Sequence, residues 1–228
     1  MIGIIGAMDQ EVSVLRDKME NMTKKVIKAI EFYSGAINGK SVVLLKSGIG
    51  KVNASVATTI LFEHYDIDLV INIGSAGGLK SEAMIGDIVI STEVAHHDVD
   101  VTVFNYEYGQ VPHMPLFYKS EERLVELMED ILDGEGFNYH KGLIVSGDSF
   151  MNTERQLVNI RTHFRNVVAV EMEASAIAQV CHIYDQPFII LRSLSDIAGQ
   201  ESNISFEKYI MKAAENSSIY LEKLLDRL

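Results

Sequence analysis

The sequence predicts a single α/β domain built on a mixed sheet. Short apolar segments of strand-like composition alternate with segments whose apolar residues recur at helical spacing. The pair Asn38-Gly39 lies between two apolar runs and favours a tight hairpin, which adds antiparallel pairing to the alternation. No linker, repeat or low-complexity tract interrupts the 228 residues, so we expect one domain over 1–228.

The first elements follow a strand, turn and helix pattern. Residues 2–6 form an apolar run closed by a glycine, which is typical of a buried strand. Asp9 is placed to cap a helix, because apolar residues then recur at helical spacing. These residues are Val12, Leu15, Met19 and Met22. Residues 32–37 and 41–45 are the expected arms of the hairpin.

The rest of the chain continues the alternation. Further strands are expected at 69–73, 88–91, 142–146, 167–170 and 188–191, and further helices at 52–65, 120–132, 173–184 and 205–228. Thr153 and Gln156 have the spacing of a capping box, which predicts one more helix start. Glycines at 74–78 predict a loop. Residues 94–116 form a long apolar and aromatic segment with two prolines, and such loops usually serve a site or an interface.

Composition excludes several classes of protein. A formal net charge of −12 would repel polyanions, so nucleic acid is not an expected partner. Uncharged runs are far shorter than the roughly 18–20 residues that a membrane-spanning helix needs. The N-terminal segment lacks the basic start of a signal peptide, and Cys181 is the one cysteine of the sequence. We therefore expect a cytoplasmic globular protein without membrane contact.

Two motifs that would indicate phosphate or metal binding are incomplete. Gly50-Lys51 resembles the centre of a nucleotide-phosphate loop, but Val52 stands where Ser or Thr is needed. His96 and His97 are adjacent on an expected strand, where side chains point to opposite faces, so we expect solvated or supporting histidines and no metal. Cys181 is expected to be a small buried residue on a helix.

Acidic residues stand where expected strands end. Glu11 follows the first strand, Glu171 and Glu173 follow the strand at 167–170, and Asp196 follows the strand at 188–191. In an open α/β sheet the ligand crevice lies beyond the carboxyl ends of the strands, so these carboxylates are expected to converge there. For any one of these acids taken alone, helix capping or surface solvation is a commoner role than catalysis, by roughly three to one.

Taken together, eight segments of the chain resemble a known family. In order they are IIGAMDQEV, LLKSGIGKVNA, INIGSAGGL, GDIVIS, YEYGQVP, GLIVSGDSF, AVEMEASAIAQVC and LRSLSDIA. They resemble bacterial 5′-methylthioadenosine/S-adenosylhomocysteine nucleosidases, the hydrolytic branch of the purine nucleoside phosphorylase-like superfamily. The resemblance implies a three-layer α/β/α fold around a mixed, partly barrel-like sheet, a homodimer, and neither metal nor cofactor. It also implies hydrolysis of the bond between adenine and a 5′-modified ribose, within methionine salvage and the recycling of S-adenosylmethionine by-products.

The resemblance also implies roles for individual residues. Glu11 would activate water, and Asp196 would protonate nitrogen 7 of adenine. The implied substrate-binding residues of the same subunit are Met8, Ile49, Ser75, Gly77, Phe150, Met151, Met172, Glu173, Arg192, Ser195 and Phe206. The implied contribution of the partner subunit is Val101, Phe104 and Pro112.

Two other functions remain open at this point. A non-catalytic nucleoside-binding protein could share the fold, but it would not need both Glu11 and Asp196 in one cleft. A phosphorylase needs cations to hold phosphate, whereas residues 7–11 contain two acids and neither Arg nor Lys. The charge pattern therefore favours hydrolysis.

Overall fold

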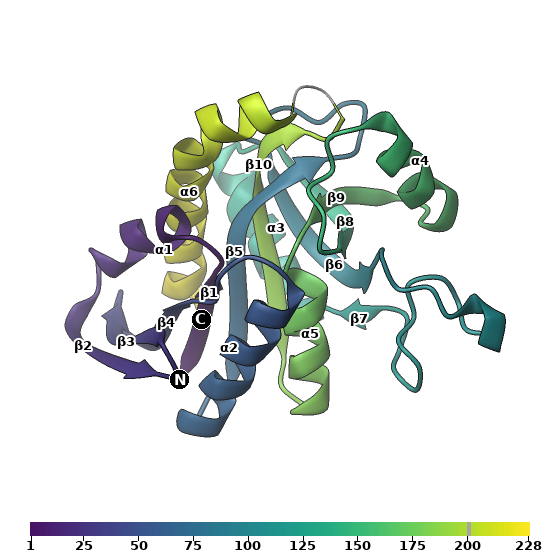
Figure 1. Cartoon of the computed structure of the whole chain (residues 1–228). Coiled ribbons are helices and arrows are strands. Elements are labelled where there is room, and N and C mark those ends of the chain that lie inside the picture. Colours follow the sequence, from purple (N-terminus) through teal and green to yellow (C-terminus); the bar gives the residue numbers. More distant parts are fainter. Residues whose placement is uncertain (200–201) are drawn as a thin grey trace.

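The computed structural model describes residues 1–199 and 202–228 (Figure 1). The strands are β1 (Ile2–Gly6), β2 (Glu20–Ile27), β3 (Ile30–Ile37), β4 (Lys40–Lys46), β5 (Leu69–Gly78), β6 (Ile88–His96), β7 (Tyr118–Lys119), β8 (Tyr139–Ser146), β9 (Val167–Glu171) and β10 (Phe188–Ile197). The helices are α1 (Asp9–Arg16), α2 (Lys51–His64), α3 (Glu122–Glu135), α4 (Glu154–His163), α5 (Ala174–Ile183) and α6 (Ser202–Arg227), with a short 3₁₀ turn at Thr102–Phe104.

The strands form one mixed sheet that closes on itself in part. Its order is β10-β6-β8-β9-β5-β1-β4-β3-β2, and β10 also pairs with β5, so five of the strands make a barrel-like ring. β1 lies parallel to both β4 and β5, whereas the β2–β3 and β3–β4 pairs are antiparallel. Within the ring, β10 runs parallel to β5, whereas the β10–β6 and β5–β9 pairs are antiparallel.

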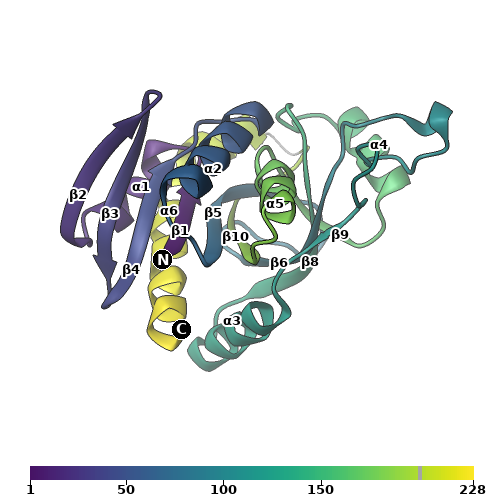
Figure 2. The same ribbon diagram turned by 90° about the horizontal axis from the view of Figure 1, so that it is seen from below.

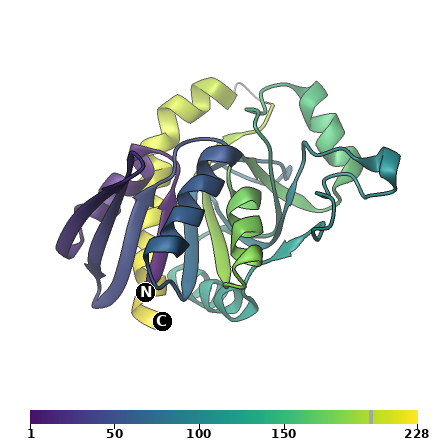
Figure 3. The same cartoon turned by 60° about the horizontal axis from the view of Figure 1, so that its bottom comes forward.

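Helices cover both faces of this sheet. α2 and α5 pack together on one face, while α1 and α3 both contact α6 on the other. Figure 3 shows α2 and α5 side by side, and in Figure 2 the strands β5 and β10 lie between α5 and α3. The expected three-layer α/β/α arrangement with a mixed, partly barrel-like sheet is confirmed.

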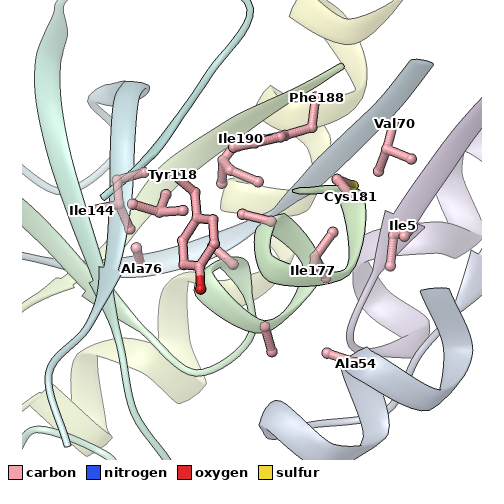
Figure 4. Packing of buried hydrophobic residues seen from close by; sticks show 14 of the residues in the cluster. Ile5, Ala54, Val70, Ala76, Tyr118, Ile144, Ile177, Cys181, Phe188 and Ile190 are labelled. Carbon is pink, nitrogen blue, oxygen red and sulfur yellow. The ribbon is translucent and has the colours of Figure 1, made fainter. Parts of the chain in front are cut away.

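The main core lies between the sheet and the α2–α5 layer. Figure 4 shows Ile177 and Cys181 of α5 packed near Ile190 of β10, and all three are fully buried. Cys181 is thus the small buried residue that the sequence predicts, and burial raises the pKa of its thiol. A thiol held neutral in this way is a poor nucleophile.

Local signals account for several elements. Asn38 and Gly39 have φ values of 49° and 73°, the conformation of a two-residue hairpin turn between β3 and β4. At the start of α4, the Thr153 N–H donates to Gln156 Oε1 at 3.0 Å, so the predicted capping box is confirmed.

Other expectations were wrong in their boundaries. The first helix ends at Arg16, not near Met22, because residues 20–27 form the exposed edge strand β2. Strand β5 continues through the expected glycine loop to Gly78, and β10 continues through Asp196 to Ile197. Pairing of these two strands along their whole length overrides the loop-like composition of their ends.

The segment between β6 and β7 is the part of the chain that projects furthest from the body (teal, Figure 1). β6 runs to His96, three residues into the expected loop, and β7 adds a short strand beyond its far end. The described helices include none that is both long and apolar enough to cross a membrane.

Candidate active site

A pocket of about 200 Å³ lies at the carboxyl ends of β1, β5, β9 and β10. Its walls are formed by Ala7, Met8, Glu11, Ile49, Ser75, Ala76, Gly77, Ser149, Phe150, Met151, Val170, Glu171, Met172, Glu173, Ser195, Asp196 and Phe206. Apart from Arg192, every site residue predicted on a single subunit lines this pocket. Ala7, Ala76, Ser149 and Val170 also line it and were not predicted. Glu171 lines it too; it was expected among the converging acids but was given no role in binding or catalysis.

Glu11 is fixed by the turn that joins β1 to α1. Its Oε2 accepts hydrogen bonds from the N–H groups of Ala7 at 2.7 Å and Met8 at 3.1 Å, so the side chain folds back over the start of its own helix. Its Oε1 accepts the Ser75 N–H at 3.0 Å, from the end of β5. The carboxylate is 3% exposed, and donors from two elements hold it in the pocket wall.

Gly74 allows a carboxylate and a guanidinium to approach the same point of β5. A Cβ at this position would lie 2.8 Å from Glu11 Oε1 and 2.9 Å from Arg192 Nη1. Arg192 is buried behind the pocket wall and not on it. Its Nη2 donates to Asn72 Oδ1 at 2.6 Å and to Glu171, whereas its Nη1 and Nε find no hydrogen-bond partner among the described groups.

Glu171 has a different role from the other pocket acids. It accepts hydrogen bonds from the N–H groups of Glu173 and Ala174, which are the first free donors of α5, and from the Ser146 hydroxyl. Together with the ion pair to Arg192, these contacts use both carboxylate oxygens. Glu171 therefore caps α5 and neutralises the buried arginine, a structural task that the sequence did not separate from catalysis.

Glu173 lies just before α5 and faces the pocket. Its Oε1 accepts the Gly50 N–H at 2.8 Å, from the turn that precedes α2. Burial, aided by the like charge of Glu171, raises the pKa of Glu173 to about 8. Near neutral pH this group can therefore gain or lose a proton.

This raised pKa predicts how the stability of the unliganded protein depends on pH. The ordinary Glu value is 4.5, so between that pH and about 8 the folded state holds a proton that the unfolded state has lost. Stability should therefore fall as pH rises through this window. We expect Glu173→Gln to melt above the wild type by a margin that grows from pH 5 to pH 8, by roughly 5 °C or more.

Differential scanning fluorimetry at the two pH values measures that margin. Glu126→Gln, on the exposed face of α3, is the matched control and should show no growing margin. A constant difference between Glu173→Gln and the wild type would mean that Glu173 has an ordinary pKa.

Asp196 reaches the pocket because β10 is irregular at this point. The register between β10 and β5 shifts between Leu194 and Asp196, and such a bulge turns a side chain to a new direction. The Ser195 hydroxyl donates to Asp196 Oδ1 at 2.9 Å. A Cβ at Gly77 would lie 3.0 Å from Asp196 Oδ2, so glycine is needed where the carboxylate crosses β5.

The opposite part of the pocket is aromatic and open. The rings of Phe150 and Phe206 meet edge to face, with centroids 5.8 Å apart and planes at 74°. Phe150 is 40% exposed and Ile49 is 52% exposed. A flat ligand that stacked on the exposed part of the Phe150 ring would bury apolar surface, which is favourable.

The residues expected from a partner subunit lie elsewhere. Val101, Phe104 and Pro112 belong to the projecting β6–β7 segment and do not line the pocket of their own chain. Phe104 is 72% exposed. His96 and His97 at the start of this segment are buried, so of the two roles expected for them, solvated or supporting, the solvated one is wrong. His96 is hydrogen-bonded to Ser175 and Gln179, which fits the supporting role.

A partly closed mixed sheet with acidic groups and an aromatic wall at its carboxyl edge defines an enzyme of the nucleoside phosphorylase type. The model of the Phosphorylase superfamily matches residues 1–226, and the chain belongs to this family. Within it, the chain is a member of the 5′-methylthioadenosine/S-adenosylhomocysteine nucleosidases, which are N-glycosyl hydrolases.

Relatives of that name match over the whole chain. The nucleosidase of Bacillus thuringiensis (strain Al Hakam) is 53% identical over 228 residues, covering 100% of this chain and 99% of the relative. A crystal structure of the Neisseria meningitidis nucleosidase in complex with methylthio-immucillin-A is 46% identical, with a TM-score of 0.97 and coverage of 100% and 99%. The Streptococcus pyogenes S-adenosylhomocysteine nucleosidase in complex with 5-methylthiotubericidin is 38% identical, with a TM-score of 0.97 and coverage of 100% and 96%.

Proposed function

We propose that the chain hydrolyses the N-glycosidic bond of 5′-methylthioadenosine and S-adenosylhomocysteine, releasing adenine and the 5-thio-substituted ribose. Other 5′-modified adenosines, such as 5′-deoxyadenosine, are further proposed substrates. The observation that carries the proposal is one pocket that holds Glu11, Glu173 and Asp196 beside the aromatic pair. The full-length relatives of that name support it.

The proposed chemistry divides the proton transfers between two acids. As the bond from ribose carbon 1′ to adenine nitrogen 9 lengthens, positive charge grows on the sugar and negative charge on the base. Asp196 gives a proton to nitrogen 7, so adenine leaves neutral. Glu11 takes a proton from the water whose oxygen bonds to carbon 1′. The proton returns from Glu11 to Asp196 through solvent, which restores the enzyme.

Other pocket residues are proposed to hold the substrate. Phe150 stacks on adenine, and the backbone of Met151 contacts the edge of the ring. Glu173 accepts hydrogen bonds from the ribose hydroxyls, and Met172 packs against the sugar. These roles are supported by the position of all four residues in the pocket wall. We propose no cofactor or metal for the reaction.

Phosphate is expected to leave the reaction unchanged. Of the described residues that line the pocket, several are acidic and none is Lys or Arg, while Arg192 lies behind the wall in its ion pair with Glu171. A phosphate dianion in this site would meet repulsion with no cation to hold it. Adenine release from 5′-substituted adenosines should therefore proceed at the same rate with and without phosphate, and mass spectrometry should find free thioribose.

The same assay tests the alternatives. Detection of ribose 1-phosphate, or a rate that rises with phosphate, would identify a phosphorylase. Tight binding of adenosine analogues without any release of adenine would identify a nucleoside-binding protein. A panel of 5′-substituted adenosines in phosphate-free buffer also ranks the proposed substrates.

We propose that the active form is a homodimer. Exposed apolar side chains gather at the start of α2 and on the β6–β7 segment, namely Ile49, Val52, Val56, Val103 and Phe104. A set of exposed apolar groups of this kind usually marks an interface. In the proposed dimer, Val101, Phe104 and Pro112 of each subunit close the 5′-thio end of the neighbouring pocket.

Phe104→Ala tests the shared pocket. Loss of the contact between the ring and a thioalkyl group should cost about 1–2 kcal/mol, so methylthioadenosine should bind roughly 5–30-fold more weakly and adenosine much less so. Calorimetry on the two ligands measures the difference. Ile183→Ala, which removes another exposed apolar side chain on α5, is the control and should leave both affinities unchanged.

Subunit mixing separates the two possible origins of the effect. A heterodimer of Phe104→Ala and Asp196→Asn subunits has both lesions in one pocket and an intact second pocket. We expect tight methylthioadenosine binding and turnover at that intact site. If exchange is verified and no such site forms, the segment does not act across the interface.

We also propose a cytoplasmic role in methionine salvage. The enzyme would remove by-products of S-adenosylmethionine reactions, because its two principal proposed substrates are both 5′-thioadenosines. The single cysteine and the acidic composition suit that compartment.

A further inference from the structure

Three loops at the carboxyl ends of β4, β6 and β8 are tied together next to the pocket. Lys51 Nζ forms an ion pair with Asp98 Oδ1, and Asp98 Oδ2 accepts the N–H of Asp148 at 3.0 Å. Asp148 Oδ1 in turn accepts the N–H of Lys51 at 2.7 Å. These three residues, which we call the three-loop clasp, therefore form a closed ring of hydrogen bonds.

The clasp is connected to the pocket carboxylate of Glu173 through Gly50, the residue before Lys51. The N–H of Lys51 is bound by Asp148, and the N–H of Gly50, the preceding residue, donates to Glu173 Oε1 at 2.8 Å. Gly50 has a φ of +94°, and a Cβ there would lie 3.0 Å from Asp148 Oδ1. The turn can thus approach both carboxylates only with glycine at this position.

The backbone beneath the clasp is also constrained. A Cβ at Gly147 would lie 2.4 Å from His97 Cε1, so the imidazole of His97 packs directly on the chain that leads to Asp148. The N–H of His97 donates to Ser146 O at 2.8 Å. Asp98 and Asp148 directly follow His97 and Gly147, whose positions are fixed by these contacts. The clasp therefore ties the Gly50 turn to a well-packed part of the chain.

We propose that Lys51, Asp98 and Asp148 are positioning residues that hold the Gly50 N–H against Glu173 and so aim the Glu173 carboxylate at the ribose hydroxyls. The inference rests on the proposed function of Glu173. Without the clasp, the Gly50 turn moves, Glu173 loses the backbone donor that Gly50 supplies, and its oxygens no longer have a fixed direction. The loss should be specific for ligands that carry ribose hydroxyls.

Two ligands that cannot be cleaved distinguish positioning from general stability. One is the C-nucleoside analogue of methylthioadenosine, in which the ribose is joined to the base through carbon. The other is its 2′,3′-dideoxy counterpart. We expect Asp98→Ala in the full-length protein to weaken binding of the hydroxyl-bearing analogue by roughly 5–30-fold. Binding of the dideoxy analogue should weaken by less than about twofold. Isothermal titration calorimetry measures both dissociation constants.

Asp100→Ala is the matched control. Asp100 lies two residues further along the same segment, and its carboxylate accepts hydrogen bonds from the N–H and the hydroxyl of Thr102 within that segment. It should leave the ratio of the two affinities unchanged, because any effect on the Thr102–Phe104 turn acts at the 5′-thio end that both ligands share. Lys51→Met, which keeps most of the side-chain volume, is a second clasp variant and gives the same readout if Asp98→Ala does not fold.

A Glu173→Gln background completes the test. If the clasp acts through Glu173, adding Asp98→Ala to Glu173→Gln should cause no further loss of affinity. The inference would be overturned if Asp98→Ala weakened the binding of both ligands equally, or if it caused a full additional loss of affinity in the Glu173→Gln background. A wild-type protein that binds both ligands equally would instead contradict the proposed role of Glu173, and the clasp would then have no ribose contact to position.

Discussion

Asp196→Asn is expected to reduce adenine release from methylthioadenosine by at least roughly 10²–10⁴-fold while leaving nucleoside binding measurable. The amide preserves the shape of the side chain and can still accept a hydrogen bond from Ser195, which donates to Oδ1. It has no proton to give to nitrogen 7 of adenine. The base would have to leave as an anion, so the barrier rises even though the substrate still fits. Single-turnover kinetics by chromatography measures the loss.

A change of leaving group makes this prediction sharper. In 4-nitrophenyl 5-methylthioriboside the leaving group departs as a stable anion and needs no acid. Asp196→Asn should therefore retain much of the wild-type activity on this compound, while its activity on methylthioadenosine is lost. Turnover of methylthioadenosine within about tenfold of the wild type, in a folded variant, would refute the assignment of Asp196 as the acid.

The predictions that succeeded depend on local signals. The hairpin at Asn38-Gly39 and the capping box at Thr153 are fixed by residues close in sequence, and both were found where expected. Strand β1 is likewise a short apolar run that ends at a glycine. The turn and the capping box can be predicted because their hydrogen bonds join residues close in the sequence. β1 can be predicted because a strand buried between two others leaves a continuous apolar run, although its own pairing is with β4 and β5.

The predictions that failed depend on partners far away in the sequence. Strand β2 is exposed along nearly its whole length, so it has neither alternation nor an apolar run to reveal it, and its pairing with β3 alone defines it. The ends of β5 and β10 are rich in glycine and serine and look like loops. They are strands because they pair with one another where the barrel-like ring closes.

The site shows the same division. Residue types and the family resemblance named the acids that the structure brings into one pocket. The buried support was not predicted, above all Asn72, which donates to Ile5 O at 2.8 Å and accepts from Arg192. A signal for it exists, since an asparagine inside the apolar run of 69–73 must find hydrogen bonds when it is buried. The identity of its partner could come only from the fold.

Glu11→Gln is expected to be as damaging as the Asp196 substitution, but for two reasons. The amide cannot take a proton from water, so general base catalysis is lost, and the rate of adenine release should fall by roughly 10²–10⁴-fold. In addition, both oxygens of Glu11 accept backbone N–H groups, Oε2 from the α1 turn and Oε1 from Ser75. A glutamine has one oxygen and one NH₂ group, so one of these backbone donors must face another donor.

This second effect calls for a control that separates geometry from base catalysis. Ser75→Ala removes the hydroxyl that approaches Glu11 Oε1 at 3.3 Å but keeps the 3.0 Å backbone contact, so it disturbs the surroundings and leaves the base in place. Ser75→Ala should reduce the rate of adenine release by about tenfold or less, which is consistent with the loss of one neutral hydrogen bond. Melting temperatures of both variants show whether the mismatch in Glu11→Gln also destabilises the fold.

The activated riboside then distinguishes the two carboxylates. A good leaving group removes the need for an acid but not for an activated water, so Glu11→Gln should remain inactive on 4-nitrophenyl 5-methylthioriboside while Asp196→Asn cleaves it. Equal activity of the two variants on this compound would mean that the roles are not divided as proposed. Because both carboxylates are buried in the same pocket, their burial alone does not assign the roles; the opposite responses to the leaving group would.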